Sequence, residues 1–165
     1  MPELGTYPQV PPTYEVFWSG NLVLVKDGNT GAIMFTDPDP ATAGNAALNL
    51  LPATGGHVHF KEGTFILTAS LRRDIDNVQI SGNGASTILV EANNTPINLI
   101  YVNGHDRWII RDLMLDGNKA NNPDAGSMLT QNGILLYNAD HCKVQRVYAH
   151  DFRYSGIWIQ SGGLS

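Results

Sequence analysis

The sequence predicts an all-β fold in which short parallel strands stack on one another as a solenoid. The first observation is an internal repeat: segment 105–117 aligns with segment 140–151 when Asp106 is placed on Asp140, an offset of 34 residues, and apolar residues then coincide. The second is a shorter repeat, because residues 132–137 match residues 155–160 at an offset of 23. The third is composition, since 17 glycines and only 15% charged residues favour short strands joined by tight turns. Repeats of this length indicate a solenoid.

The length and charge of the chain limit its class. A chain of 165 residues is expected to form one domain with a substantial core. We expect an extended arm and small β-cap over residues 1–36, and a capping helix followed by stacked coils over residues 37–165. The net charge of −5 argues against a nucleic-acid partner, which needs a basic face. No run of 18 apolar residues predicts a membrane span, and the single cysteine excludes an internal disulfide.

The N-terminal elements are read from turn and capping chemistry. Strands are expected over residues 14–25, interrupted at 19–21, and over 32–35, with turn residues at 27–31 between them. Asp39 can cap a helix whose first position is Pro40, and Pro52 would stop it. Its expected apolar stripe is Ala43, Ala46, Ala47, Leu50 and Leu51. We expect this helix to plug one end of the solenoid.

The repeat also predicts which residues stack on which. It places Asp112 on Arg146, Asp116 on His150 and Ile134 on Ile157. Further strands are expected over 55–60, 63–68, 77–80, 86–90 and 98–102. The two offsets differ because residues 118–131 look like an insertion, which would be either the rim of a groove or a tolerated surface loop.

Four segments together resemble the opening coils of a right-handed parallel β-helix of the pectate-lyase-like superfamily. They are GlyGlyHisValHisPheLysGluGlyThrPheIleLeu (55–67), AsnValGlnIleSerGlyAsnGlyAlaSerThrIleLeuVal (77–90), IleArgAspLeuMetLeuAspGlyAsn (110–118) and GlyIleTrpIleGln (156–160). The resemblance covers roughly residues 35–165 and implies a helix that caps the first coil. The group includes polysaccharide lyases, glycoside hydrolases, alginate-type epimerases and phage tailspikes, so the resemblance does not fix an activity. None of its catalytic motifs matches residue by residue.

The candidate catalytic residues are Asp116, His150, Asp151 and Arg153. They fall on outward or turn positions one coil apart, where a carboxylate, an imidazole and a guanidinium can combine acid/base chemistry with anion binding. The alternative is structural: Asp112 with Arg146 would be an exposed pair worth at most about 1 kcal/mol, and Asp116 would shape a turn.

Candidate ligand-binding residues surround this set. Tyr148 and Trp158 should point outward, where their rings could stack on sugars, and Lys119 lies in the inserted segment, whereas Trp108 should belong to the core. Calcium is a possible cofactor, because Asp116, Asp140 and Asp151 offer the oxygen ligands that it prefers. His57 and His59 share a strand face, but no third metal ligand is nearby in sequence, so a surface pair is favoured.

Two functions fit these observations. The first is an enzyme that acts on an extracellular polysaccharide by lyase or hydrolase chemistry. The second is a non-catalytic adhesin, tailspike-like or filament-forming module that assembles with its own kind through an open β-helix end. Residues 156–163 would begin a coil, so we expect further coils or a second subunit beyond them. Both functions place the protein outside the cell or on a cell or virion surface.

Overall fold

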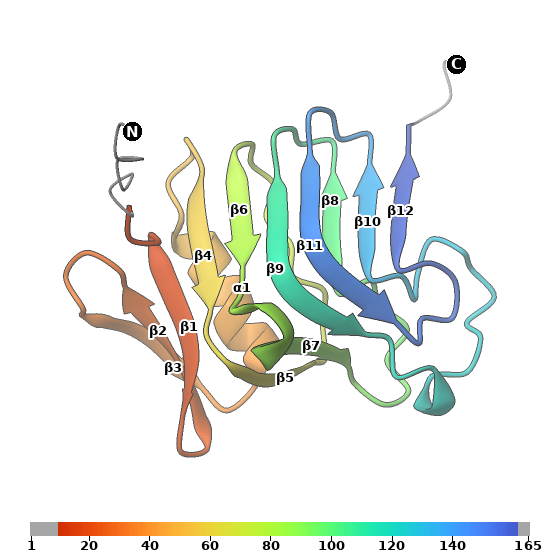
Figure 1. The fold of residues 1–165 in the computed structure, drawn as a ribbon, viewed down its shortest axis with the longest axis horizontal. Coiled ribbons are helices and arrows are strands. Elements are labelled where there is room, and N and C mark those ends of the chain that lie inside the picture. Colours follow the sequence, from red (N-terminus) through yellow and green to blue (C-terminus); the bar gives the residue numbers. More distant parts are fainter. Residues whose placement is uncertain (1–9, 162–165) are drawn as a thin grey trace, which may run out of the picture.

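A computed structural model describes residues 10–161 of the chain, and the expected all-β class is confirmed. The strands form a nine-stranded mixed sheet and a three-stranded parallel sheet, and among the described residues there is one α-helix (Figure 1). No helix in the described part of the chain is long and apolar enough to cross a membrane. The N-terminal part of the expected arm, residues 1–9, lies outside the described residues.

Three antiparallel strands precede the helix: β1 (Tyr14–Ser19), β2 (Leu22–Asp27) and β3 (Ile33–Asp37). The predicted turn between β2 and β3 is held by Asp27, whose carboxylate accepts hydrogen bonds from the backbone N–H groups of Asn29 (2.9 Å) and Thr30 (2.8 Å). On its other side β1 pairs in parallel with β4 (Gly56–Phe60). The β-cap is therefore continuous with the sheet that follows.

Helix α1 (Pro40–Leu50) begins as predicted, because Asp39 accepts hydrogen bonds from the backbone N–H groups of Ala41 and Thr42. The predicted apolar stripe was partly wrong. Ala43, Ala47 and Leu51 are buried, but Leu50 is exposed, and the stripe continues through Leu48 instead. The helix lies close to the first coil: a Cβ added to Gly44 would lie 2.7 Å from Leu71 and 3.1 Å from Phe60. Only glycine permits this approach.

The rest of the chain winds through four circuits, here called coils, whose strands stack on three faces. The first face carries β4, β6 (Val78–Ser81) and the first halves of β9 (Ile109–Asp116) and β11 (Lys143–His150). The second face carries β5 (Gly63–Leu67), β7 (Thr87–Glu91) and the second halves of β9 and β11. The third face carries β8 (Ile100–Asn103), β10 (Ile134–Tyr137) and β12 (Ile157–Gln160).

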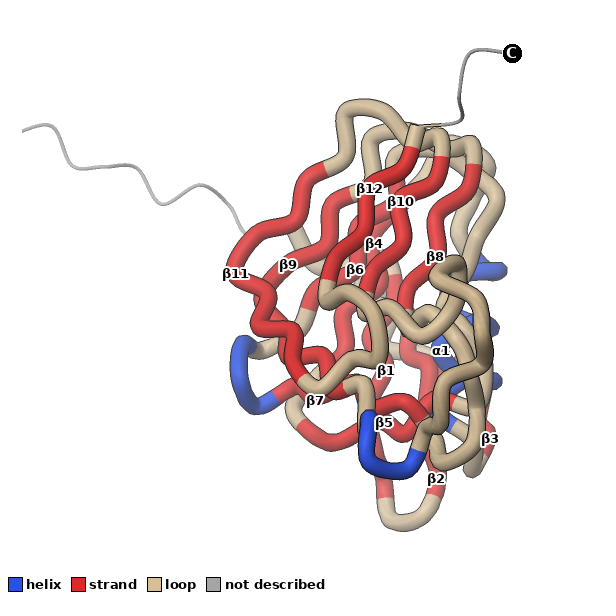
Figure 2. Tube along the Cα trace, turned by 90° about the vertical axis from the view of Figure 1, so that its right-hand side faces the viewer, coloured by secondary structure: helices blue, strands red, loops and turns tan. Residues whose placement is uncertain are grey.

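Figure 2 shows this arrangement from the side of β12, with β9 and β11 on the left, β8 on the right, and β5 and β7 below. Two 3₁₀ turns lie outside the strands: η1 (Gly84–Ser86), in the turn between β6 and β7, and η2 (Lys119–Asn121), in the inserted segment. All strand pairs between coils are parallel.

The 34-residue repeat gives the observed register. Asp116 pairs with His150, and Ile134 pairs with both Ile100 and Ile157, as predicted. The strands β9 and β11 turn from the first face to the second at Asp112 (φ 56°) and Arg146 (φ 49°), which both adopt left-handed backbone conformations. This corner is why β9 pairs with β6 before it and with β7 after it.

The core is built from side chains that point into the coils. Trp108 is fully buried, as predicted, and its indole N–H donates to the carbonyl of Ile75 (2.9 Å). Phe60 and Phe65 meet edge to face with centroids 5.3 Å apart. Aliphatic residues from successive coils stack above these rings, including Val58, Ile80, Ile110, Leu89, Leu115, Ile100 and Ile134. Each short strand therefore gains most of its stability from the coils beside it.

Polar side chains repeat from coil to coil as well. Asn98 Oδ1 accepts from both the backbone N–H (3.1 Å) and the side-chain amide (3.0 Å) of buried Asn132, and Asn132 Oδ1 accepts from the N–H of Ser155 (3.0 Å). Asp76 likewise accepts from the N–H of Asp106 (3.1 Å), and Asp106 accepts from the N–H of Asp140 (2.8 Å). These ladders satisfy turn N–H groups that the sheets leave unpaired.

Glu91 is a buried carboxyl group at the end of β7. Its side chain is fully buried, Oε1 accepts from the N–H of Ile97 (3.2 Å), and Oε2 has no hydrogen-bond partner. Burial raises the pKa of this carboxyl to about 7, against the opposing effect of the Ile97 N–H. The folded state therefore favours the protonated form.

We predict that Glu91→Gln stabilises the protein at alkaline pH. A carboxyl pKa that folding raises costs no stability below the unfolded pKa, near 4.5. The cost grows as pH rises through the folded pKa and then levels off at about 3 kcal/mol. Denaturant unfolding of both proteins should show a gain of about 1–3 kcal/mol at pH 8 and little difference at pH 4. A gain of equal size at both pH values would contradict this explanation.

Candidate functional site

The structure brings together three of the four predicted catalytic residues. Asp116 ends β9, His150 ends β11 directly beside it, and Asp151 follows. Their ligating atoms all lie within 4.8 Å of one another. His150 Nδ1 is 2.9 Å from Asp151 Oδ2 and 4.0 Å from Asp116 Oδ1. Lys119 joins Asp116 and Asp151 in lining a hollow of about 460 Å³. We call this set the Asp116 cluster.

Arg153 is engaged elsewhere, because it holds the inserted segment in place. Its guanidinium donates to the carbonyl of Asn122 (2.8 and 3.3 Å) and to that of Lys119 (3.0 Å). The sequence offers no sign of these backbone carbonyls, which lie 31 and 34 residues earlier in the chain.

Asp140, the third predicted calcium ligand, does not join the Asp116 cluster. It precedes β11 whereas His150 ends it, so the whole strand lies between them. Its place in the Asp76, Asp106 and Asp140 ladder gives it a structural role in the turn. Asp116 and Asp151 therefore remain, with His150, as the residues that could hold a divalent cation here.

The two predicted aromatic contacts lie on different faces. Tyr148 projects from the second face with 63% of its surface exposed, and its ring lies 5.3 Å from that of His150. Trp158 lies on the third face, where it pairs with Leu135, whose side chain is covered. Tyr148 can contribute to a site at the Asp116 cluster, but Trp158 cannot line the same site.

The predicted stacking of Asp112 on Arg146 is confirmed. Arg146 Nε and Nη2 both bond the carboxylate, the latter at 2.9 Å, and Arg111 bonds it too. Hydrogen bonds from Arg146 and then Arg111 lower the pKa of Asp112 to about 2. Because Arg146 is largely exposed, this remains a surface pair of modest energy.

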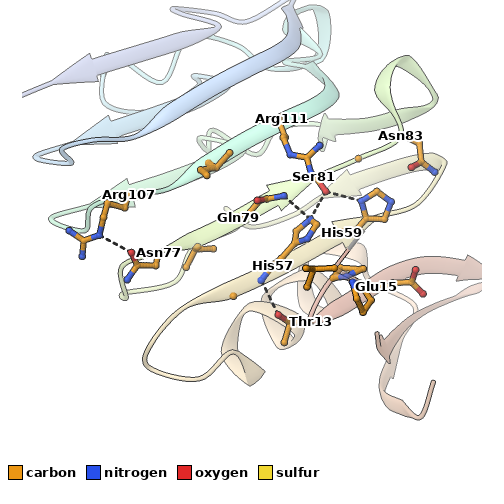
Figure 3. Close-up of a pocket in the computed structure, with 17 residues that line it drawn as sticks. Thr13, Glu15, His57, His59, Asn77, Gln79, Ser81, Asn83, Arg107 and Arg111 are labelled. Carbon is orange, nitrogen blue, oxygen red and sulfur yellow. Dashed lines mark hydrogen bonds between the residues drawn. The ribbon is translucent and has the colours of Figure 1, made fainter. Parts of the chain in front are cut away.

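The largest hollow lies on the outer face of β4, β6 and β9, where the sequence analysis placed no site. It has a volume of about 960 Å³ and is called here the imidazole groove (Figure 3). Two outward rows form its floor: His57 beside Gln79, and His59 beside Ser81 and Arg111. Thr13, on the arm before β1, forms part of one wall and accepts a hydrogen bond from the backbone N–H of His57 (3.0 Å).

One hydroxyl links the two imidazoles of the groove. Ser81 Oγ lies 2.6 Å from His57 Nε2 and 2.8 Å from His59 Nδ1, and Ser81 is almost completely buried beneath the rings. The side chain of Gln79 is 3.1 Å from the same His57 Nε2. As Figure 3 shows, Arg111 approaches this group from β9.

Both imidazoles are uncharged at neutral pH. Burial lowers the pKa of His57 to about 4, and the nearby His59 and Arg111 lower it further in the same direction. Burial also lowers the pKa of His59, opposed by a hydrogen bond with Asn83 and by the charge of Glu15. The groove thus combines two neutral imidazoles with the permanent charge of Arg111.

The sequence gave one signal for this groove, which was the pair of histidines two residues apart on one strand. It was interpreted as a surface pair because the partners come from other coils. Ser81 lies 22 residues after His59, and Arg111 lies 30 residues after Ser81. Neither spacing equals the 34 or 23 of the recognised repeats, so the alignment did not place these residues side by side.

Comparison with known proteins gives little further guidance. No protein-family model matches the chain, and no curated protein matches it. Among solved structures the chain is similar to the A-module of the Azotobacter vinelandii mannuronan C-5 epimerase AlgE6, with 18% sequence identity and a TM-score of 0.46. The match covers 74% of this chain and 37% of that one.

Two arginines provide a test of the roles assigned here. Arg153→Ala should lower the free energy of unfolding by about 1.5–3 kcal/mol, because a charged group would be lost from backbone carbonyls. Arg146→Ala, a matched removal of an exposed guanidinium, should cost less than about 1 kcal/mol. Urea unfolding measures both. Equal effects would show that Arg153 does not anchor the inserted segment.

Proposed function

We propose that this chain forms the opening coils of a right-handed parallel β-helix that binds an extracellular acidic polysaccharide in the imidazole groove and cleaves it as a lyase. The observation that carries the proposal is the pair of uncharged imidazoles beside Arg111 in the largest hollow. The in-register parallel coils support the β-helix assignment.

The position of the groove suits an extended polymer. It crosses three parallel strands and therefore spans roughly 10 Å at the usual spacing between neighbouring strands. Its walls come from the arm before β1 on one side and from Arg107 and Arg111 on the other. Polar side chains and backbone around an open hollow can bond the hydroxyl groups of a sugar chain without enclosing it.

The side chains of the groove suit elimination better than hydrolysis. Glycoside hydrolysis normally needs two carboxyl groups that flank the bond to be cut. Among the lining residues Glu15 is the one carboxylate, and it is paired with Lys26 and, at 3.5 Å, with Lys61. A neutral imidazole can instead take the proton from the carbon beside a uronate carboxylate, while a guanidinium stabilises the charge that develops on that carboxylate.

The balance of the proposed reaction is simple. The imidazole takes the proton on C5, the electrons of that C–H bond form the C4=C5 double bond, and the glycosidic oxygen leaves C4 and gains a proton. A bound carboxylate would also raise the low pKa of His57, because an opposite charge favours imidazolium. That shift would strengthen His57 as a base when substrate is present.

The Asp116 cluster is proposed as an accessory site. Asp116 and Asp151 offer oxygen ligands for calcium, which can bridge an acidic protein surface and an acidic polymer. The cluster lies beyond the Asp112 corner, on the second face, whereas the groove lies on the first face. It would therefore contact a different part of the polymer from the groove.

The function is tested by removing the two groups that the chemistry needs. His57→Ala and Arg111→Ala should each reduce the release of unsaturated uronate from a polyuronate by at least about 100-fold. The ultraviolet absorbance of the conjugated product measures this release. Gln145→Ala is the matched control, because Gln145 is exposed in the same row as Arg111 but does not line the groove.

Two results would overturn this assignment. Full activity in His57→Ala would remove the groove from the reaction. Loss of activity in Asp116→Asn, with full activity in His57→Ala, would move the site to the Asp116 cluster.

A second candidate function is assembly, which one observation favours. Ile157 and Ile159 on β12 stack on inward-facing residues of β10, yet they are 42% and 71% exposed. The outer edge of β12 pairs with no strand among residues 10–161. Unpaired strand edges with apolar side chains favour association with further strands, so homo-oligomers could form at this end.

Assembly predicts an oligomer that depends on this end. The protein should sediment as a concentration-dependent oligomer, and Ile159→Asp should shift it to monomer, because the substitution places a charge in the contact. The matched variant Ile66→Asp, at a 52% exposed position on the second face, should leave the oligomer intact. Monomer at every concentration, measured by analytical ultracentrifugation, would exclude assembly through β12.

A further inference from the structure

The floor of the imidazole groove holds one continuous chain of hydrogen bonds. It runs through Gln79, His57, Ser81 and His59, and each neighbouring pair is within 3.1 Å. The residues come from β4 and β6, which pair His57 with Gln79 and His59 with Ser81. Rigid strands therefore hold the chain in place.

The chemistry of a hydroxyl limits how protons are placed along it. Ser81 Oγ carries one hydrogen, so it can donate to one imidazole nitrogen and must accept from the other. Two arrangements satisfy both contacts. Either His57 carries its proton on Nε2 and Ser81 donates to His59 Nδ1, or His59 carries its proton on Nδ1 and Ser81 donates to His57 Nε2.

Gln79 decides between these arrangements. With its amide oxygen turned toward Arg111, Gln79 accepts from Arg111 Nη2 (2.9 Å), Arg111 Nε (3.1 Å) and His57 Nε2 (3.1 Å). The opposite orientation would set the amide N–H groups against the guanidinium, which has only donors. Gln79 therefore accepts, and His57 Nε2 must carry a proton.

The far end of the chain agrees with this direction. The side-chain amide nitrogen of Asn83 donates to Glu62 Oε2 (2.9 Å), which leaves its oxygen as an acceptor. Asn83 makes a side-chain hydrogen bond with His59. An acceptor at His59 favours a proton on Nε2 of that ring, since Nδ1 receives the hydrogen of Ser81.

We propose that Gln79, Ser81 and Asn83 are positioning residues that orient a proton relay through His57 and His59, with Nδ1 of His57 as the base that receives the substrate proton. This inference rests on the proposed lyase function and names the reacting atom within it. Among the described residues no hydrogen bond is recorded for His57 Nδ1, so that nitrogen is open to a ligand.

The relay conserves protons. A proton that arrives at His57 Nδ1 lets Nε2 pass its own proton to Ser81 Oγ, and Ser81 passes its hydrogen to His59 Nδ1. His59 then releases its Nε2 proton, which can go to the departing glycosidic oxygen. Both rings end neutral in the opposite tautomer, and proton exchange with water restores the starting state.

The charged groups around the relay keep it uncharged at rest. Arg111 lies on β9 beside Gln79, and Lys61 follows β4, and both disfavour imidazolium. Glu15 on β1 acts in the opposite sense on His59, but its carboxylate is shared with Lys61 and Lys26.

The first test needs no substrate. Long-range ¹H–¹⁵N spectra of the complete chain at pH 7.5 should show protons on Nε2 of both His57 and His59, and Nδ1 of His59 should carry the nitrogen shift of a hydrogen-bond acceptor. In Ser81→Ala that shift should change toward the free value, whereas Ser70→Ala, which removes a hydroxyl outside the groove, should leave it unchanged. A proton on Nδ1 of His57 in the unaltered protein would overturn the proposal.

The second test measures turnover of a polyuronate. Ser81→Ala should lower kcat on the order of 10- to 100-fold with little change in KM, because the base remains but its orientation is lost. Ser81→Thr, which keeps the hydroxyl, should restore most of the rate. Unchanged kcat and unchanged ring shifts in Ser81→Ala would sink the relay while leaving the lyase function intact.

The two proposals can therefore fail separately. If the ring shifts follow the expected pattern but neither the protein nor any variant produces unsaturated uronate, the lyase function fails and the oriented hydrogen-bond chain stands.

Discussion

The structure depends on backbone hydrogen bonds between strands of successive coils. None of these strands exceeds eight residues, and many have only four, so no strand or hairpin of the stack could be stable in isolation. Parallel pairing in a constant register satisfies the backbone and, by the same act, places side chains of one kind above one another. The aliphatic core, the Asn98 and Asn132 pair and the row of His59, Ser81 and Arg111 all follow from that register.

The same register explains why the groove and the Asp116 cluster are separate. On a flat sheet, residues 111 and 116 of one strand would share one surface or lie directly behind it. In β9 the left-handed conformation of Asp112 turns the strand through the corner of the coil. Arg111 therefore faces the imidazoles, whereas Asp116 faces His150 on the next surface. A single residue conformation, repeated at Arg146, divides the outer surface into regions with different chemistry.

Much of the fold could be predicted from the sequence, because periodicity reports on stacking directly. The pairs Asp116 with His150 and Ile134 with Ile157 followed from two offsets, and the helix start followed from Asp39 and Pro40. The groove did not follow, since the first coils are shorter than the later ones and His57, Ser81 and Arg111 share no constant spacing. Arg153 was misassigned for a related reason: its partners are backbone carbonyls, which carry no sequence signal.

The ladder of Asp76, Asp106 and Asp140 has a consequence for how such a chain can change during evolution. Each carboxylate receives the N–H of its counterpart in the next coil, so every turn supplies one acceptor and one donor to its neighbours. Duplication or loss of a whole coil would leave this chain of contacts closed. Gain or loss of one residue would displace an aspartate from its partner and bury an unpaired N–H. Growth by complete units is therefore tolerated where single-residue insertions are not, except in segments such as 118–131 that leave the stack altogether.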